Sequence, residues 1–331
     1  MTTRGWVIVG TGLMGKLFPP DLIARPGNQI VGIVSRNKES AIKLAKMHGV
    51  SEDLCFTDFD AAVNRPEVHV VYLGTPPSEH SRQVIAAVKH GKAVLCEKPF
   101  TTNKKEAVEA VEFARKQKVF LLEALFSHYT PLWTALRQIF RGEHHQISIT
   151  DLGRPLHLEA NIGIPQNPDN APSLFSSKCG GGALGAVSVY PINLAYTVFG
   201  ERPTRYEGKI VNGATNVDEV NDITFEYEGG AKAHFLGRIR EKDSAPAIIK
   251  TENGEIIVDA PWWCPKKMTV RIDGRSEIVL TAQIDGKGYG YEVDEVNRCL
   301  DEGLIESPVF DLNRSIDIMD LMDELKANLT Q

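Results

Sequence analysis

Glycines and a lysine follow apolar runs at two points in the first hundred residues. The first pattern is Gly10-Thr-Gly-Leu-Met-Gly15, and the second is Cys96-Glu-Lys-Pro99. Glycines at this spacing, between a strand and a helix, allow a tight turn and a backbone that approaches a pyrophosphate at the positive end of the helix. A lysine at the end of a strand can orient a substrate hydroxyl or lower the pKa of a neighbouring acid. The two patterns therefore predict a dinucleotide site with Lys98 available for proton chemistry.

The residues after the second apolar run bear on which dinucleotide is bound. The sequence there is Val34-Ser35-Arg36-Asn37, without the Asp or Glu that would bind the ribose hydroxyls of NAD. A hydroxyl followed by a guanidinium suits a 2′-phosphate, because arginine can bind phosphate through two hydrogen bonds. We therefore expect NADP as the cofactor. The alternative is that Arg36 is an ordinary surface arginine.

A third loop, Gly74-Thr-Pro-Pro-Ser-Glu-His80, follows an apolar run that ends at Leu73. Cofactors bind at the carboxyl edge of a parallel sheet, so we expect Thr75 and Pro76 to face the cofactor. His80 either belongs to this site or is a structural residue at the start of a helix. The expected cofactor contacts are Gly10, Thr11, Gly12, Leu13, Met14, Gly15, Ser35, Arg36, Thr75, Pro76, His80, Glu97 and Lys98.

Strands and helices must alternate to place these loops at one edge. Nearly all-apolar runs predict strands at residues 5–9, 29–34, 68–73, 93–96 and 119–123. Helical patterns occupy residues 38–48, 78–90 and 104–116. This alternation predicts βαβ units and a parallel sheet with both faces covered. Pro19 and Pro20 indicate a short or broken helix after the glycines.

The pattern changes after about residue 125. One helix is expected at residues 131–140, and others at 291–303 and 313–329. Strands with turn signals between them are expected at residues 156–162, 223–228, 231–238, 247–251, 254–257 and 269–272. The fold class is therefore α/β. A Rossmann domain with a doubly wound parallel sheet is expected over residues 1–125, and an α+β domain with an open, mostly antiparallel sheet over residues 126–331.

Composition limits the classes of partner. The net charge is −6 and no block of Lys and Arg forms a basic stripe, so neither nucleic acid nor a membrane surface is an expected partner. The five cysteines are scattered without CxxC spacing, which argues against disulfides and a metal site. No apolar stretch approaches the roughly 20 residues of a membrane helix, and no signal-peptide pattern precedes the first strand. We expect a cytoplasmic protein with a small-molecule substrate.

Several motifs together resemble one family over nearly the whole chain. They are the Gly10–Gly15 loop, Thr75-Pro76 with His80, Glu97-Lys-Pro99, Glu123-Ala124, and Gly180-Gly-Gly-Ala-Leu184 with Tyr190. This set is similar to the glucose-fructose oxidoreductase and inositol dehydrogenase (Gfo/Idh/MocA) family. Five further segments resemble one branch of this family, the dimeric dihydrodiol dehydrogenases and NADP-dependent D-xylose dehydrogenases. They are residues 94–99, 120–124, 261–265, 290–292 and 306–308.

The resemblance implies an NADP-dependent enzyme whose catalytic centre is Lys98 with Tyr190, and a cis peptide bond before Pro99. Tyr190 would exchange the hydroxyl proton while Lys98 stabilises the developing alkoxide. The alternative for Tyr190 is a buried core phenol. The further candidates for contact with substrate are Phe126, His128 and Trp263. The branch also implies a homodimer, and the open sheet face, which the short helices are too few to cover, is the expected interface.

One position departs from the family pattern. Most relatives place an aspartate four residues before the catalytic residue, where this chain has Ala186. Residues 173–179 also lack the arginine and Asp-Pro often found there. Three hypotheses follow: a dehydrogenase for sugars or cyclic diols with altered turnover, a cofactor-binding regulator without turnover, and a biosynthetic reductase with another substrate. We expect the first, with hydride transfer between NADP and a hydroxyl-bearing carbon.

Overall fold

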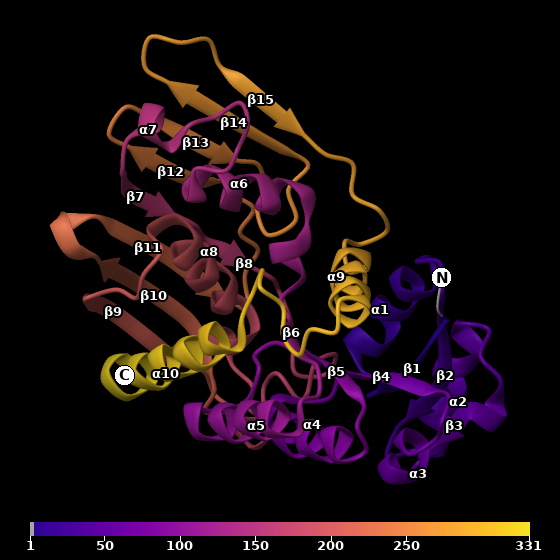
Figure 1. Ribbon diagram of the computed structural model, residues 1–331. Coiled ribbons are helices and arrows are strands. Elements are labelled where there is room, and N and C mark those ends of the chain that lie inside the picture. The colour runs from indigo at the N-terminus through magenta and orange to yellow at the C-terminus, as the bar shows by residue number, and fades with distance from the viewer. Residues whose placement is uncertain (1–2) are drawn as a thin grey trace. The chain divides into compact units, whose positions relative to one another are not determined.

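The computed structural model describes residues 3–331, which divide into two compact units. The first unit contains the described residues up to Phe126 together with Asp285–Asp320. The second contains Ser127–Ile284 and Leu321–Gln331. Figure 1 shows the chain coloured from its N-terminus to its C-terminus. The later part of the chain thus returns to the first unit before it ends in the second.

The first unit is built on a six-stranded parallel sheet. Its strands are β1 (Arg4–Val9), β2 (Asn28–Val34), β3 (Cys55–Phe56), β4 (Val68–Leu73), β5 (Ala93–Glu97) and β6 (Leu121–Ala124). They pair in parallel in the order β3-β2-β1-β4-β5-β6, so their carboxyl ends lie at one edge. The strand order reverses between β1 and β4, and open α/β sheets bind ligands beyond the carboxyl ends at such a point.

Helices connect these strands and cover the sheet. They are α1 (Leu13–Ile23), α2 (Lys38–Met47), α3 (Phe59–Val63), α4 (His80–Lys89) and α5 (Lys104–Gln117). Asn37, Asp58 and Asn103 cap α2, α3 and α5 by accepting backbone N–H hydrogen bonds. Short 3-10 turns at Glu52–Leu54 and Pro77–Glu79 precede β3 and α4.

The first helix, α1, continues through Pro19 and Pro20 rather than breaking there. A proline inside a helix leaves the carbonyl four residues earlier without its amide donor, and for Pro19 that carbonyl belongs to Gly15. Phe18 stacks on Tyr72 of β4, with ring centroids 3.8 Å apart. Contacts with the rest of the unit therefore keep α1 helical despite its prolines.

The second unit is built on a mixed sheet. Its strands are β7 (Pro155–Glu159), β8 (Ile162–Gly163), β9 (Arg205–Asn212), β10 (Asp218–Glu226), β11 (Lys232–Arg238), β12 (Ala247–Thr251), β13 (Gly254–Val258), β14 (Lys267–Ile272) and β15 (Ile278–Thr281). The order is β15-β14-β13-β12-β7-β11-β10-β9, with β8 beside β11. The pairs of β11 with β7 and β8 are parallel and the others are antiparallel.

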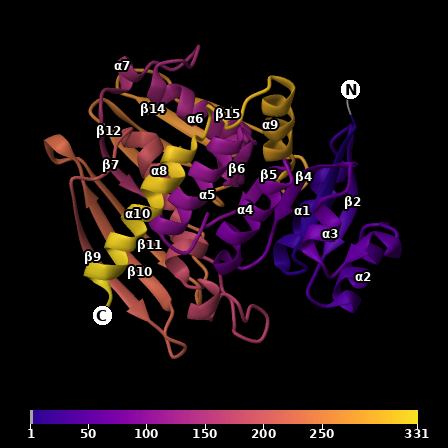
Figure 2. The ribbon, with the colours of Figure 1, turned by 60° about the horizontal axis from the view of Figure 1, so that its bottom comes forward.

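One face of this sheet is covered by helices, and the opposite face carries polar residues together with the exposed Val211 and Val279. Figures 1 and 2 show α6 (Pro131–Arg141) and α8 (Val189–Phe199) over the covered face. Ile223, Phe225 and Phe235 are buried on it, and Phe225 packs edge-on against Phe235 at 5.3 Å. Polar residues such as Thr224 alternate with them along β10. The short helix α7 (Ile149–Leu152) precedes β7.

One stretch in residues 3–331 is long and apolar enough to span a membrane by those two criteria. It is Ser177–Phe199, with a mean hydropathy of 1.3, so the expectation that no apolar stretch approaches this length is wrong. However, 83% of its apolar window is buried inside the protein. A helix that is apolar all round belongs to a core when it is enclosed in this way. The stretch is therefore a core helix of the second unit.

The C-terminal helices are α9 (Gly290–Asp301) and α10 (Leu312–Leu329). The segment between them packs on the first sheet, because the Leu121 N–H donates to the Ile305 carbonyl and Arg115 pairs with Glu306 at 3.0 Å. The structure therefore divides the chain differently from the expected ranges 1–125 and 126–331. The first boundary lies within a residue of the expected one, whereas Asp285–Asp320 rejoins the first unit.

The expected fold class is confirmed, with a parallel sheet followed by a mostly antiparallel one. The sequence patterns missed the strands β3, β9 and β15, the short helices α3 and α7, and the longer helix α8. β3 has only two residues, and β9 is mostly exposed with little apolar alternation. α8 is buried almost throughout, so its apolar residues show no helical period.

Candidate active site

The Gly10–Gly15 loop joins β1 to α1. Gly10 has a φ of 102°, and a Cβ there would lie 2.6 Å from the Gly74 carbonyl oxygen. A Cβ on Gly15 would lie 2.2 Å from the Gly10 carbonyl oxygen, whereas a Cβ on Gly12 would meet nothing within 4 Å. The fold thus requires the outer glycines, and Gly12 leaves room for a pyrophosphate against the backbone. The first turn of α1 holds no acidic residue, so the positive helix end is not neutralised.

Ser35 and Arg36 follow β2 beside this loop. The Ser35 hydroxyl lies 3.2 Å from the Thr11 hydroxyl, and the Ser35 N–H donates to the Phe56 carbonyl. Arg36 is exposed at the same edge. The structure therefore brings together the residues expected to hold the adenosine end of the cofactor.

Lys98 follows β5, and its peptide bond to Pro99 is cis, as the resemblance implies. The Lys98 side chain is half-buried. Burial lowers the pKa of Lys98, and the nearby carboxyl groups of Glu97 and Glu123 partly offset that fall. Glu123 is itself buried at the end of the neighbouring strand β6, and burial raises its pKa to about 7. A cation and two carboxyl groups with displaced pKa values thus lie at one edge of the sheet, as is common at functional sites.

A third carboxyl group, Glu292 of α9, lies in the same unit. The Tyr72 hydroxyl donates to Glu97 Oε1 at 2.6 Å, while both Glu292 oxygens are buried without a hydrogen-bond donor among the described residues. Burial, and then the charge of Glu97, raise the pKa of Glu292 well above its usual value. Burial also raises the pKa of Glu97. A buried carboxylate without a donor is costly, so this environment favours the protonated form of Glu292.

His80 lies under this edge of the sheet. Its ring is fully buried, with Nδ1 at 3.1 Å from the Pro99 carbonyl oxygen and Nε2 at 2.9 Å from that of Thr75. Burial lowers the pKa of His80. These contacts tie the loop after β4 to the loop after β5. They favour the structural alternative for His80, which positions Thr75 and Pro99, over direct contact with the cofactor.

The substrate candidates divide between the two units. Phe126 follows β6 in the first unit, and its ring lies 4.9 Å from that of Tyr289. His128 and Trp263 lie in the second unit. The His128 ring is buried 5.1 Å from the Trp133 ring, and Trp263 packs edge-on against Trp262 at 5.7 Å. Each residue thus lies in an aromatic group within its own unit.

Tyr190 lies in the second unit, at the second residue of α8. It is 6% exposed and follows a π-helical turn, Leu184–Ser188, of a kind that often occurs at functional sites. Asp218 anchors this turn by accepting the Leu184 N–H at 2.6 Å. Ala186 is the one residue of the turn that is not buried. A side chain at position 186 therefore has access to the space beside the turn.

No functional role was assigned from sequence to Tyr72, Glu123, Glu292 or Tyr289, although Glu123 and Glu292 lie in motifs that carry the resemblance. Glu123 had a signal, because a carboxylate that ends an apolar strand is unusual. Tyr72 lies inside an apolar strand, and Glu292 lies in an ordinary helical pattern. Only their burial in the folded unit distinguishes them.

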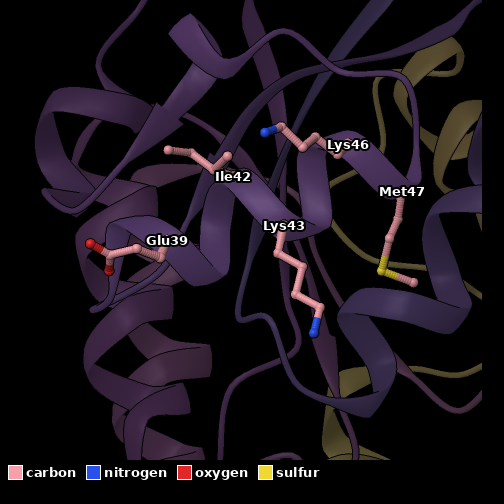
Figure 3. Close-up of a pocket in the computed structure, with 5 residues that line it drawn as sticks. All are labelled: Glu39, Ile42, Lys43, Lys46 and Met47. Carbon is pink, nitrogen blue, oxygen red and sulfur yellow. The ribbon is translucent and has the colours of Figure 1, made fainter.

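A shallow hollow lies along the outer surface of α2. Figure 3 shows its lining residues, which all belong to that one helix: Glu39, Ile42, Lys43, Lys46 and Met47. Ligand sites enclose a small molecule between walls that carry converging polar groups. A hollow formed by one helix surface has no opposing wall, so it does not compete with the edge at Lys98.

Two matches to known families cover most of the chain. Residues 4–124 match the oxidoreductase family with an NAD-binding Rossmann fold, and residues 144–276 match the GFO/IDH/MocA C-terminal domain. The chain belongs to the Gfo/Idh/MocA oxidoreductase family. The first unit is accordingly the NAD(P)-binding Rossmann fold of this family, as the Gly10–Gly15 loop predicted.

Individual relatives agree with this family assignment. Trans-1,2-dihydrobenzene-1,2-diol dehydrogenase of Sus scrofa is 28% identical over 330 residues, which cover 97% of this chain and 95% of the relative. A 3-ketoreductase from Actinomadura kijaniata, solved with NADP and TDP-benzene, matches with a TM-score of 0.84 and 19% identity over 100% and 98% of the two chains. Levoglucosan dehydrogenase, solved with NADH and levoglucosan, matches with a TM-score of 0.87 and 17% sequence identity. The match covers 99% of this chain and 97% of the dehydrogenase. The two solved structures support the fold.

Proposed function

We propose that this chain is an NADP-dependent dehydrogenase or reductase acting on a hydroxyl or carbonyl carbon of a sugar, a cyclic diol or a related small molecule. The observation that carries the proposal is Lys98, set between buried carboxyl groups at the carboxyl edge of a Rossmann sheet. The names of similar proteins, a diol dehydrogenase and a levoglucosan dehydrogenase, support the substrate class.

Lys98 and Tyr190 have the proposed catalytic roles. A bound nicotinamide would supply or accept the hydride. The Tyr190 phenol exchanges the proton of the substrate hydroxyl, and the Lys98 ammonium stabilises the oxygen as negative charge develops on it. An ammonium group beside a phenol lowers the pKa of that phenol, which in this proposal would make the proton exchange easier near neutral pH. Phe126, His128 and Trp263 contact the substrate in this proposal.

The reaction is tested by an absorbance screen at the nicotinamide band. The protein is mixed with NADP and a panel of aldoses, cyclic diols and dicarbonyls, and NADPH is used for the reductive direction. Turnover of any member that disappears in Lys98→Ala supports the proposal. Tight NADP binding without turnover across the panel contradicts it.

The preference for NADP over NAD is a separate part of the proposal. Solved structures of similar fold contain either cofactor, so the support comes from Ser35 and Arg36 beside the glycine loop. One hydrogen bond to a charged group is worth about 1.5 to 3 kcal/mol, so NADP(H) is expected to bind roughly tenfold tighter or more. Fluorescence titration of both cofactors measures the ratio. Arg36→Ala should remove most of the preference, and joint Ser35→Asp and Arg36→Ala should reverse it.

A matched control for these variants is Arg205→Ala. Arg205 is an exposed arginine on β9 of the second unit, so its loss changes the net charge by the same amount as Arg36→Ala without touching the first unit. The control should keep the wild-type ratio. Equal affinities of the wild type for NADP(H) and NAD(H) would contradict the assignment of Ser35 and Arg36.

A cofactor-binding regulator is the second candidate, and Ala186 is the observation that favours it. Ala186→Asp restores a carboxylate at the accessible position of the π-helical turn. If the proton relay works, turnover of an aldose or diol should rise by roughly one to two powers of ten, the value of one charge-assisted hydrogen bond. Ala186→Asn, which has a similar shape without charge, should give little gain, and Tyr190→Phe in the Asp variant should remove most of it.

These variants lie outside the first unit, so NADP affinity should stay within a few fold, and thermal unfolding serves as the control for folding of the second unit. An Asp variant that folds, binds NADP and shows no turnover favours the regulator or a reductase with another substrate. A wild-type activity that survives Tyr190→Phe undiminished would remove Tyr190 from the mechanism.

We also propose a homodimer formed through the face of the second sheet opposite α6 and α8. Val211 and Val279, on strands near the two edges of this sheet, are 37% and 46% exposed. Exposed apolar side chains on an uncovered sheet face are typical of an interface. Light scattering at several concentrations tests this. A 36.5 kDa species that persists at high concentration would contradict it.

A further inference from the structure

The loop of residues 285–289 before α9 is docked on α1 within the first unit. The Asp21 carboxylate on α1 is 6% exposed and accepts the backbone N–H groups of Lys287 and Tyr289, each at 2.9 Å. Arg25, just beyond the C-terminal end of α1, pairs with Asp285 at 3.2 Å and with Asp294 at 3.1 Å. Figure 1 shows α9 beside α1. Hydrogen bonds and ion pairs therefore hold this loop at a fixed place on the Rossmann unit.

Glycines allow the loop to approach α1 this closely. Gly286 has a φ of 57°, and a Cβ there would lie 2.1 Å from Asp21 Oδ1. A Cβ on Gly290 would lie 2.5 Å from Arg25 Nε. A side chain at position 286 or 290 would push the loop away from α1. The glycine spacing of this segment is therefore explained by docking.

The docked loop places Tyr289 at the dinucleotide edge of the sheet. The Tyr289 hydroxyl lies 4.0 Å from Met14 Sδ, and Met14 belongs to the Gly10–Gly15 loop. The Tyr289 ring lies 4.9 Å from the ring of Phe126, which follows β6. Tyr289 is half-buried, so part of its ring is accessible. Its side chain thus connects the glycine loop after β1 with the residues after β6.

The strand order indicates which half of the cofactor Tyr289 would meet. Ser35 and Arg36 follow β2, on one side of β1, whereas β4, β5 and β6 lie on the other side. A dinucleotide lies across the point where the strand order reverses, with the ribose that carries the 2′-phosphate at the β2 side. Met14 and Phe126 mark the opposite side. The nicotinamide half therefore extends toward Tyr289.

We infer that Tyr289 is a cofactor-binding residue and that the loop of residues 285–289 forms a wall of the site beside the nicotinamide half of the dinucleotide. Asp21 is a positioning residue in this arrangement, because it acts through the loop. The inference rests on dinucleotide binding by the first unit and deepens the proposed function. It adds to the site a segment more than 260 residues away in sequence, since the hydrogen bond between Tyr289 and Asp21 spans 268 residues.

The test compares two ligands on each variant by calorimetric titration. NADPH contains both halves of the cofactor, whereas 2′,5′-ADP contains only the adenosine half with its 2′-phosphate. Tyr289→Ala should weaken NADPH roughly tenfold, the scale of one lost aromatic contact, and leave 2′,5′-ADP within about twofold. Tyr289→Phe keeps the ring and should lose less. Gly286→Ala should reproduce the selective loss, because it displaces the loop from Asp21.

Tyr206→Ala is the matched control, since Tyr206 is a half-buried tyrosine on β9 of the second unit. It should leave both affinities unchanged. NADPH affinity within twofold of wild type in Tyr289→Ala, or an equal loss for both ligands, would overturn the inference. If Tyr289→Ala does not fold, Tyr289→Phe and Gly286→Ala decide by the same criterion. If the wild type prefers NADH, the same comparison is made with NADH in place of NADPH and ADP in place of 2′,5′-ADP. That preference would contradict the proposed NADP specificity and leave the inference about Tyr289 to be decided by the new pair.

Discussion

Lys98 and His234 each have two carboxyl groups as neighbours, yet the pKa of Lys98 is lowered and the pKa of His234 is raised to about 9. His234 is on β11, where its ring lies 2.9 Å from Glu159 and 3.1 Å from Asp222. Its side chain is 31% exposed, so the hydrogen bond to Glu159 outweighs desolvation. Around Lys98 burial is the larger effect, and the carboxyl groups themselves are buried.

Burial thus separates two clusters that contain similar residue types. The cluster on the open sheet face, formed by His234 with Glu159 and Asp222, is held by ion pairs and contributes to stability. The cluster at the Rossmann edge contains carboxyl groups whose pKa values are raised, to about 7 for Glu123, so protons can be exchanged there near neutral pH. The difference explains why one cluster suits proton chemistry and the other suits a structural role.

The largest expected effect is the loss of activity in Lys98→Ala. Removal of a group that stabilises charge and assists proton transfer should lower kcat/KM by roughly two to four powers of ten. His234→Ala, in the other cluster, should leave kcat/KM nearly unchanged. NADPH affinity measured in parallel shows how much of the loss comes from cofactor binding. A fall of less than tenfold would remove Lys98 from the catalytic centre.

A smaller effect is expected on stability in Glu292→Gln. The pKa of Glu292 is raised by burial and by Glu97 and Asp21, so its stabilising contribution is present below the unfolded value of about 4.5 and is lost as the pH rises through the raised value. The glutamine variant does not titrate, so the free energy of unfolding of the variant minus that of the wild type should be larger at pH 8 than at pH 4.5.

Urea unfolding of both proteins at the two pH values measures this difference. If the free energies of unfolding of the wild type and Glu292→Gln changed equally with pH, the pKa of Glu292 would not be raised in the folded protein.

The smallest effect is expected in His234→Gln. The pKa of His234 is raised from 6.5 to about 9, so its contribution is fully present below 6.5 and is lost as the pH rises through 9. The variant should lose roughly 0.5 to 1 kcal/mol of unfolding free energy at pH 6, the scale of a part-exposed ion pair, and less at pH 10. Urea unfolding at one fixed protein concentration measures it, because dimer formation would add a concentration term. An equal loss at both pH values would show that the ion pairs do not stabilise the sheet.

Local patterns were sufficient for much of the first unit. The Gly10–Gly15 loop lies between an apolar strand and a helix, and its geometric requirements act over a few neighbouring residues. Lys98 stands at the end of a strand whose apolar run was visible in the sequence. The same reasoning missed β9 and α8, because a mostly exposed strand and a fully buried helix both lack the periodicity that marks their type.

The amino-acid sequence by itself determined the family, the two sheets, the dinucleotide loop and the position of Lys98 at the sheet edge, because each depends on spacing within a short segment. Only the tertiary structure decided that residues 285–320 return to the first unit, that His80 links two loops, and that Glu292 is buried without a donor from residues 3–331. Tyr289 beside Met14 belongs to the same group. These outcomes depend on which surfaces are buried against each other, and burial between segments hundreds of residues apart leaves no local pattern in the sequence.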